Sequence, residues 1–448
     1  MRQRRRPPGP RGEPLFGNVR KYADDPFDFL DAVSDAYGDV VGFDLGPYET
    51  VLVTHPDQIE RVLVAEDAKY HKPDFQDDAL GQLLGNGLLL SEGETWRKQR
   101  NLVGPAFAPD RVVSLAETMA GHAESMVGSW AAGDVVDVEA EMARVTVKII
   151  ADAMFGVEFD AERVRRVQEN LDPLGSRFEP NPFRFLVPDW APTRENREYD
   201  AALAELDAVL DDVLEERRGT EGGDGDDPPT DMLSLLLRAE RRGDQTEAQI
   251  RDEMMTMLLA GHDTTALTLT YALYLLSKHP DAERRLHEEV DSVVDGAAPT
   301  AADVREFTFV DRVLREAMRR YPPVWVMFRQ PQVDVELGGY RLPAGTTVML
   351  SQWATHRDGR WYDDPDAFDP DRWAPERRRE RPSFAYFPFG GGPRSCIGRQ
   401  FSLLEAKLIL GTIASRYRLE YARDGPFDLR GTLTMHPNDP VEMRVVPR

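Results

Sequence analysis

The feature that most constrains the fold is a long helical pattern between residues 246 and 277 that is apolar almost throughout. Thr246 and Gln249 have the spacing of a capping box at its start, and Pro280 follows its end. From Met254 to Leu276 the pattern is apolar on nearly all sides. A helix of this kind cannot lie on a surface without exposing a large apolar area to water. We therefore expect it to run through the centre of the protein.

The remaining sequence predicts a mainly α protein with small β-sheets (α+β). Residues from about 56 to 218 are expected to be mostly helical, including 135–155 and 201–214, and a further helix is expected at 400–417. The strand patterns are few and short, and the first two form a hairpin around Gly46 and Pro47. They lie at 40–43, 50–53, 333–337, 346–350 and about 433–445.

Composition and charge exclude several classes of protein. The 448 residues carry 55 basic and 79 acidic side chains, and the formal net charge of −24 disfavours binding to nucleic acid or anionic membranes. No apolar run approaches the roughly 20 residues of a membrane span, and no apolar segment follows the Arg-rich start to complete an export signal. We expect a soluble cytoplasmic protein with a lead-in at 1–20, a single domain at 21–448 and a mobile acidic loop at 219–230.

The basic residues are unusual, because only seven are Lys and 48 are Arg. Few lysines and strong net negative charge together suggest a halophilic prokaryote, in which an acidic surface keeps its hydration in salt. A GC-rich codon bias in an acidic protein is the alternative explanation.

The single cysteine, Cys396, excludes an intramolecular disulfide and any cysteine-cluster metal site. It lies in the segment Phe389-Gly-Gly-Gly-Pro-Arg394-Ser-Cys396-Ile-Gly398. Glycines let a backbone approach a flat partner closely, while amide donors, Arg394 and the N-terminus of the following helix favour a thiolate. We expect this loop to present a sulfur atom to a ligand.

Two further motifs place polar groups on helices. Glu316 and Arg319 share one helix face, which alone indicates no more than a weak salt bridge. The segment Ala260-Gly261-His262-Asp263-Thr264-Thr265 interrupts the long apolar pattern with a carboxyl group and two hydroxyls, which are costly to bury. The hydroxyls could simply bind the carbonyls of the preceding turn and bend the helix. The alternative is a functional group at the centre of the protein.

These three segments together resemble the cytochrome P-450 family. The Cys396 segment matches the family's haem-binding signature F-x-x-G-x-R-x-C-x-G at every fixed position, and the others resemble its E-x-x-R and A-G-x-D/E-T-T motifs. The resemblance runs from about Arg20 to the end and is nearest the long-chain, fatty-acid-hydroxylase-like branch. It implies the family's fold, with the long helix over the haem and the cysteine loop beneath it.

The resemblance also implies roles for single residues. Cys396 would be the axial ligand of the iron of haem b, Thr264 would hydrogen-bond dioxygen, and Asp263 would relay protons. Glu316 and Arg319 would form a buried structural triad with Arg372, in a segment that reads Pro370-Asp371-Arg372-Trp373 where the family has P-E-R-F. The other implied haem contacts are Trp96, Arg100, Ala260, Gly261, Arg329, Phe389 and Arg394. The implied substrate contacts, which could equally be ordinary core, are Leu88, Leu89, Leu90, Val324, Trp325, Val326 and Thr434.

The function implied is that of a haem-thiolate monooxygenase. It would insert one oxygen atom from dioxygen into a C–H bond or double bond of an apolar substrate of long-chain or isoprenoid type. Two electrons would come from a separate protein such as a ferredoxin, which would bind a monomeric enzyme near a cluster of cations. That cluster is expected to comprise Arg394, Arg399 and Lys407, with Arg377, Arg378, Arg379 and Arg381 nearby. A haem-based gas sensor or carrier and a peroxide-driven enzyme of the same fold are the alternatives.

Overall fold

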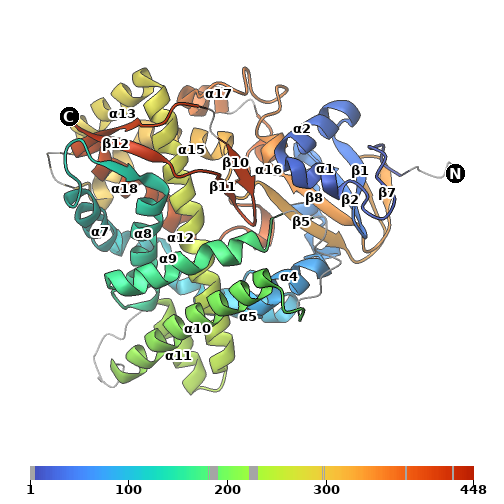
Figure 1. Cartoon of the computed structure of the whole chain (residues 1–448), viewed down its shortest axis with the longest axis horizontal. Helices are drawn as coiled ribbons and strands as arrows, with labels where there is room; N and C mark the ends of the chain where they lie inside the picture. The colour runs from blue at the N-terminus through green and yellow to red at the C-terminus, as the bar shows by residue number, and fades with distance from the viewer. Residues whose placement is uncertain are drawn as a thin grey trace.

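The computed structural model describes residues 6–179, 181, 190–220, 231–294, 296, 298–378, 381–425 and 428–448. It confirms the predicted class: helices make up most of the protein, and a five-stranded sheet lies to one side of them (Figure 1). Of the expected acidic loop, Gly219 and Thr220 end helix α10, and 221–230 lie outside the described residues. Within the described part of the chain, no helix has both the length and the apolarity needed to cross a membrane.

The long central helix is present as expected. It is α12, Glu247–Lys278, capped by Thr246 and Gln249 in a capping box. It packs along α8 and also contacts α10, α15 and α18, so its apolar faces are covered by other helices rather than by water. Figure 1 shows it passing through the middle of the helical part.

The other helices differ mainly in length from the sequence-based expectation, and the helix predicted at 400–417 is α18. The bounds are α1 Val19–Asp24, α2 Pro26–Tyr37, α3 Pro56–Glu60, α4 Asp74–Leu84, α5 Gly93–Val103, α6 Pro109–Ser114, α7 Ala116–Gly128, α8 Val138–Ile150, α9 Ala161–Ser176, α10 Arg194–Thr220, α11 Met232–Arg241, α13 Pro280–Val293, α14 Ala301–Glu306, α15 Thr308–Arg320, α16 Gln352–Thr355, α17 Pro375–Arg378 and α18 Arg399–Arg416.

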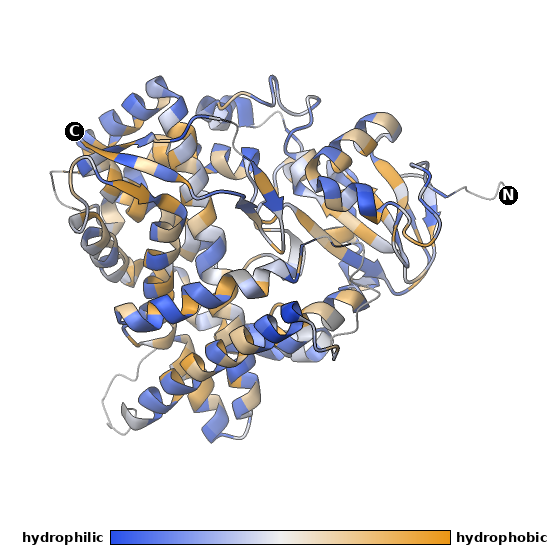
Figure 2. Ribbon diagram, viewed as in Figure 1, coloured by the Kyte–Doolittle hydropathy of each residue, from blue (hydrophilic) through white to orange (hydrophobic). Residues whose placement is uncertain are grey.

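The main sheet has the strand order β1-β2-β8-β5-β3, in which β2 and β8 are parallel and the other neighbours antiparallel. Its strands carry many apolar residues (Figure 2), and β8 is buried along its whole length. The bounds are β1 Val40–Leu45, β2 Tyr48–Val53, β3 Tyr70–His71, β4 Val135–Asp137, β5 Val326–Pro331, β6 Val335–Leu337, β7 Tyr340–Leu342, β8 Thr347–Ser351, β9 Tyr417–Tyr421, β10 Leu429–Gly431, β11 Met435–Pro437 and β12 Glu442–Pro447.

One predicted helix begins too early. Residues 135–155 were expected to be helical, but Val135–Asp137 form β4, which pairs antiparallel with β12 near the C-terminus. Asp137 then caps α8 by accepting hydrogen bonds from the backbone N–H groups of Glu139 and Ala140. The strand depends on a partner about 300 residues away in sequence, so local periodicity could not predict it.

Candidate active site

Cys396 lies between a 3-10 turn, Gly392–Arg394, and the start of α18. Its backbone N–H donates to the carbonyl of Phe389 at 2.9 Å, and the backbone N–H of Gly398 donates to its sulfur. Burial raises the pKa of the thiol, while Gly398, Arg100 and Arg399 act in the opposite direction. The cations that lower the pKa of this thiol are Arg100 and Arg399, so the expected contribution of Arg394 to a thiolate stays a prediction.

The thiol nevertheless has accessible surface, although the chain around it buries it deeply. Ala260 on α12 is likewise exposed, in the middle of a helix whose neighbours are mostly buried. Both observations indicate an opening inside the protein. Beside it the helices α12 and α18 meet, where the hydroxyls of Thr265 and Ser402 lie 2.9 Å apart.

The glycines of the loop are required by protein packing. Gly390 and Gly392 both have φ of +67°, which side chains rarely adopt. A Cβ at Gly392 would lie 1.9 Å from the carbonyl oxygen of Leu63, and one at Gly391 would lie 2.5 Å from the Phe384 ring. At these two positions the expected close approach to the loop backbone is present, but the approaching groups are Leu63 and Phe384.

A group of cations shares one carboxylate near this loop. Arg394 donates to the carbonyl of Ser91 at 3.0 Å and to the carboxylate of Glu92, and Lys72 Nζ lies 3.3 Å from the same carboxylate. Burial, assisted by Arg394, lowers the pKa of Lys72 to about 8 and that of Arg329 to about 10. Buried cations in excess of their counter-ions call for an anionic ligand.

Trp96 connects this group to the cysteine. The guanidinium carbon of Arg394 lies 4.6 Å from the centre of the Trp96 ring, and that of Arg100 lies 5.8 Å from it. The structure thus brings Arg394 to Trp96 and Arg100, which lie one turn apart on α5 and almost 300 positions earlier in the sequence. Sequence reasoning missed Lys72 and Glu92, because nothing in their local sequence indicates burial beside two arginines.

These residues fit haem b. A thiol that opens to an interior space could bind its iron, and the excess of buried cations could neutralise its two propionates. Cys396 would hold the iron, and Trp96, Arg100, Arg329, Arg394 and Lys72 would surround the propionates. Lys72 is therefore an additional candidate ligand.

The expected triad is assembled. Arg319 donates to both oxygens of Glu316 at 2.8 and 2.9 Å, and Arg372 Nε donates to Glu316 at 3.1 Å; all three side chains are buried. Asp371 and Trp373, which differ from the family's P-E-R-F pattern, are also hydrogen-bonded. Trp373 Nε1 donates to Glu316 at 2.9 Å, and Asp371 accepts from Arg285 and Arg312.

The Thr264 hydroxyl donates to the carbonyl of Ala260 at 3.1 Å, one turn earlier, and α12 is continuous through this point. A hydroxyl bound to a carbonyl of the preceding turn is one of the two interpretations that the sequence left open.

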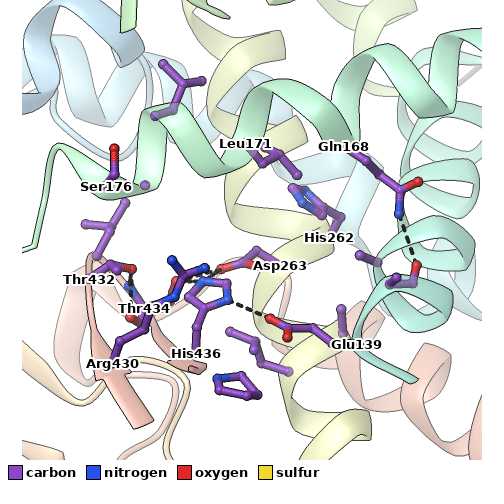
Figure 3. Close-up of a pocket in the computed structure, with 18 of the residues that line it drawn as sticks. Glu139, Gln168, Leu171, Ser176, His262, Asp263, Arg430, Thr432, Thr434 and His436 are labelled. Carbon is purple, nitrogen blue, oxygen red and sulfur yellow. Dashed lines mark hydrogen bonds and ion pairs between the residues drawn. The ribbon is translucent and has the colours of Figure 1, made fainter. Parts of the chain in front are cut away.

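Asp263 lies on a different face, turned toward the C-terminal hairpin of β10 and β11 (Figure 3). The Thr434 hydroxyl donates to Asp263 Oδ2 at 2.7 Å, and His436 Nε2 lies 3.6 Å from the same oxygen. His436 Nδ1 lies 2.8 Å from Glu139 Oε1. Burial alone would raise the pKa of Asp263, but His436 and Thr434 lower it to about 2. Burial would lower that of His436, but Asp263 and Glu139 raise it to about 10.

Three of the expected substrate contacts line one or the other of two cavities. Trp325 and Val326 line a cavity of about 410 Å³ with Phe75, Phe328 and Leu433. Thr434 instead lines a second cavity of about 370 Å³ with Asp263 and His436. Leu88 and Leu90 are buried, Leu89 is 41% exposed, and Val324 is half-buried and lines neither of these two cavities.

The expected cluster of docking cations is only partly available. Lys407 Nζ is paired with Asp311 at 2.8 Å and is mostly buried, and Arg394 is engaged with Glu92. Arg377 pairs with Asp369, and Arg381 lies over the rings of Trp373 and Tyr362. Arg379 lies outside the described residues, whereas Arg378 and Arg399 are exposed.

Comparisons with known proteins agree with this site. A family model described as cytochrome P-450 matches residues 7–442. The chain is 38% identical to cyclooctatin synthase of Streptomyces melanosporofaciens over 92% of its own length and 89% of that protein, and 33% identical to pentalenene oxygenase of Streptomyces avermitilis over 93% and 91%. The crystal structure of a cytochrome P-450DA haem domain superimposes with a TM-score of 0.88 at 29% identity, covering 100% of this chain and 99% of that one. These relatives support neither the fatty-acid-hydroxylase-like branch nor a halophilic source.

Proposed function

This chain belongs to the cytochrome P-450 family of haem-thiolate monooxygenases, and we propose that it inserts one oxygen atom of dioxygen into a C–H bond or double bond of an apolar isoprenoid. Two electrons per turnover come from a separate redox protein such as a ferredoxin. A cytoplasmic location and a monomeric state stay predictions.

The observation that carries this proposal is the combination of Cys396 with the buried cations. A sulfur that opens to an interior space is joined, through Trp96, to Arg394 and its neighbours, which hold more positive charge than Glu92 can neutralise. A haem-based sensor or carrier would need the same charge, so the charge identifies the cofactor and the measurements below distinguish the enzyme. The sulfur and the excess positive charge together fit a planar group that carries two negative charges and is bound by a thiolate.

When bound, the haem supplies the reductive activation of dioxygen, for which a thiolate ligand favours cleavage of the O–O bond, as the family's axial cysteine does in general. The chain's own residues bind and orient the haem and supply the protons. Cys396 binds the iron, Arg329 and Arg394 orient the propionates, and the Glu316 triad braces the side of the protein that holds the cysteine loop. The Thr264 hydroxyl, which in this structure donates to the carbonyl of Ala260, would turn to donate a hydrogen bond near the site of oxygen reduction, and Asp263 would pass on protons.

The substrate class follows from the cavities and from the relatives' names. The cavity beside Val326 is lined by aromatic and aliphatic side chains, including Phe75, Trp325 and Phe328. One relative is named for pentalenene, by its name an alkene. An apolar, compact isoprenoid alkene or its alcohol suits such a lining better than a charged substrate does.

The decisive experiment is spectroscopic. Reduced protein with carbon monoxide should show the strongly red-shifted Soret band of thiolate-ligated haem, Cys396→Ser should lose it, and Ser395→Ala, its neighbour in the loop, should keep it. A wild-type spectrum typical of histidine ligation would contradict the assignment.

A second measurement separates an enzyme from a gas sensor or carrier. Isoprenoid alkenes should shift the spin state of the ferric iron and yield oxygenated product with a ferredoxin, its reductase and NADPH. A protein that binds carbon monoxide normally but shows no spin shift with any apolar compound would favour the sensor. Product formed with peroxide alone and not with the electron-transfer proteins would favour the peroxide-driven alternative.

A further inference from the structure

His436 lies between two carboxylates that come from different helices. On one side Nδ1 is 2.8 Å from Glu139 Oε1, at the start of α8. On the other side Nε2 is 2.9 Å from the Thr434 hydroxyl oxygen and 3.6 Å from Asp263 Oδ2, on α12. The ring therefore bridges α8 and α12 from the hairpin strand β11 (Figure 3).

The number of hydrogen-bond donors around His436 determines the charge of its ring. The Thr434 hydroxyl has one hydrogen, which it donates to Asp263 at 2.7 Å, so its oxygen accepts from His436 Nε2. Glu139 as a carboxylate can only accept, so Nδ1 also carries a hydrogen. A neutral imidazole has a hydrogen on one nitrogen only, and it would leave one of these contacts unmade. With Glu139 ionised, only an imidazolium between two anions makes all of these contacts. A proton on Glu139, whose pKa burial raises, would instead leave the ring neutral, and the titration below distinguishes the two states.

The second cavity, of about 370 Å³, lies against this cluster. The residues of α12 that line it recur at helical spacing and form one face: Leu259, His262, Asp263, Ala266 and Leu267. Thr264 is not among them. It follows Asp263 by about 100° around the helix, so the carboxyl group opens to the cavity and the hydroxyl does not.

A buried acceptor at the same wall indicates that the cavity holds a hydrogen-bond donor. His262 is 1% exposed, and its Nδ1 is hydrogen-bonded to the carbonyl of Leu258, which places the ring hydrogen on Nδ1. Nε2 is then a bare acceptor, and it has no partner among the described residues. A cavity of this size with several polar groups in its wall can hold water.

We propose that His436 is a positioning residue for Asp263. Glu139 fixes the His436 ring, and the ring holds the Asp263 carboxylate against the water of this cavity. The cavity is therefore the entrance for the protons that are used at Thr264. The proposal rests on the monooxygenase function given above and adds the residues that supply its protons. Asp263 is a carboxylate in this structure and holds no proton of its own, so it accepts a proton from a cavity water as it passes one on toward Thr264, and that water regains its proton from solvent. The imidazolium is not consumed, because its two hydrogens stay in their bonds to Glu139 and Thr434.

The charged and titratable groups around the ring come from several elements. They are Asp263, His262 and Tyr271 from α12, Glu139 from α8, Asp137 at the end of β4, Arg430 from β10, and Asp439 beyond β11. From α9 the wall receives the uncharged side chains of Gln168 and Ser176.

The first test needs no turnover. In the carbon-monoxide complex of the reduced holoenzyme, labelled with ¹³C at histidine Cε1, the chain's eight histidines can be titrated by NMR, and His436→Gln identifies the signal of His436. We expect this signal to show no titration between about pH 5 and pH 8, where an ordinary histidine loses its proton. In Glu139→Gln its midpoint should fall by at least about one pH unit. Titration of wild-type His436 near its ordinary value would overturn the assignment.

The second test measures proton supply. With a ferredoxin, its reductase and NADPH, the share of consumed electrons that ends as hydrogen peroxide should rise several-fold in His436→Gln. His436→Lys, which keeps a cation, should restore most of the wild-type value, and Ser176→Ala, which changes the same cavity wall without touching Asp263, should match wild type. Unchanged peroxide in His436→Gln, or equal increases in the Gln and Lys variants, would overturn the positioning role. Failure of the monooxygenase function itself would instead appear in the wild-type spectrum or in the absence of product.

Discussion

At the scale of single residues, the motif positions were predictable and their partners were not. Cys396, Glu316 and Arg319 stand in local patterns that specify their chemistry. Lys72, Glu92 and His436 acquire theirs from contacts that span roughly 20 to 300 positions. Asp263 shows both cases: the motif marked it as important, but only the fold places His436 and Glu139 beside it.

Trp373 offers a test of the buried triad. Trp373→Phe removes the indole N–H that donates to the Glu316 carboxylate at 2.9 Å, in a site with no access to water. A hydrogen bond to a buried charged group contributes about 2 kcal/mol, so the thermal midpoint of the holoenzyme should fall by a few degrees. Trp361→Phe is the matched control, because the Trp361 N–H has no partner among the described residues. Equal losses in the two variants would show that ring size, not the hydrogen bond, matters.

Glu253 predicts a dependence of stability on pH. It is fully buried on α12, where Oε2 accepts from the N–H of Leu88 at 3.1 Å, and burial raises its pKa from 4.5 to about 7. As pH rises, the unfolded chain loses this proton first, so the folded state loses stability between about pH 4.5 and pH 7. Glu253→Gln should therefore be more stable than wild type at pH 8, by on the order of 2 kcal/mol, and nearly equal to it at pH 4.5.

A control on the same helix should behave in the opposite way. Glu247 is exposed, and its hydrogen bond with Arg218 lowers its pKa. Its contribution is present above its ordinary pKa and is lost as pH falls. Glu247→Gln should thus lower the thermal midpoint slightly at pH 8 and not at acid pH. If both variants changed stability in the same direction at pH 8, the burial argument for Glu253 would be wrong.

At the scale of elements, helices were predicted well because their periodicity is local. The capping box at Thr246 and the apolar pattern located α12 to within a residue at each end. Strands were predicted less well. The strand β5, Val326–Pro331, contains Arg329 and ends in proline, and it exists because β8 pairs with it and β3 lies on its other edge. Such pairings depend on the arrangement of the whole chain.

Thr264 tests whether the polar interruption of α12 is structural or chemical. Thr264→Ala removes a hydroxyl that, among the described residues, bonds only the preceding turn, and alanine favours a helix, so the thermal midpoint should stay equal or rise slightly. Carbon monoxide and substrate binding should persist while hydrogen peroxide replaces product. Thr270→Ala is the control, because Thr270 makes the same bond to Ala266 at 2.9 Å on another face of the helix. Normal coupling in Thr264→Ala would leave the hydroxyl a structural role alone.

At the scale of the whole molecule, the acidic charge of −24 makes any exposed cation a candidate contact for an acidic redox protein. Most arginines in the expected docking cluster are paired or stacked, as Arg377 and Arg381 are. Arg399 remains exposed at the start of α18, three residues after Cys396. Arg378 is exposed as well, and neither it nor Arg399 forms an ion pair among the described residues; Arg399, which lies over the Phe389 ring, is the nearer of the two to Cys396 in the sequence.

The contribution of Arg399 to the rate of reduction by a ferredoxin should depend on the salt concentration. At about 0.1 M salt the screening length is roughly 10 Å, so the Arg399 charge can steer an acidic ferredoxin; at about 1 M it is roughly 3 Å, and only contact pairs persist. Arg399→Glu should slow reduction strongly at low salt and only slightly at high salt. Arg418→Glu makes the same change beyond the far end of α18, about 27 Å along the helix, and should have a small effect at both. Equal slowing by Arg399→Glu at both salts would indicate a direct contact instead of steering, and equal slowing by both variants would indicate that net charge alone decides the rate.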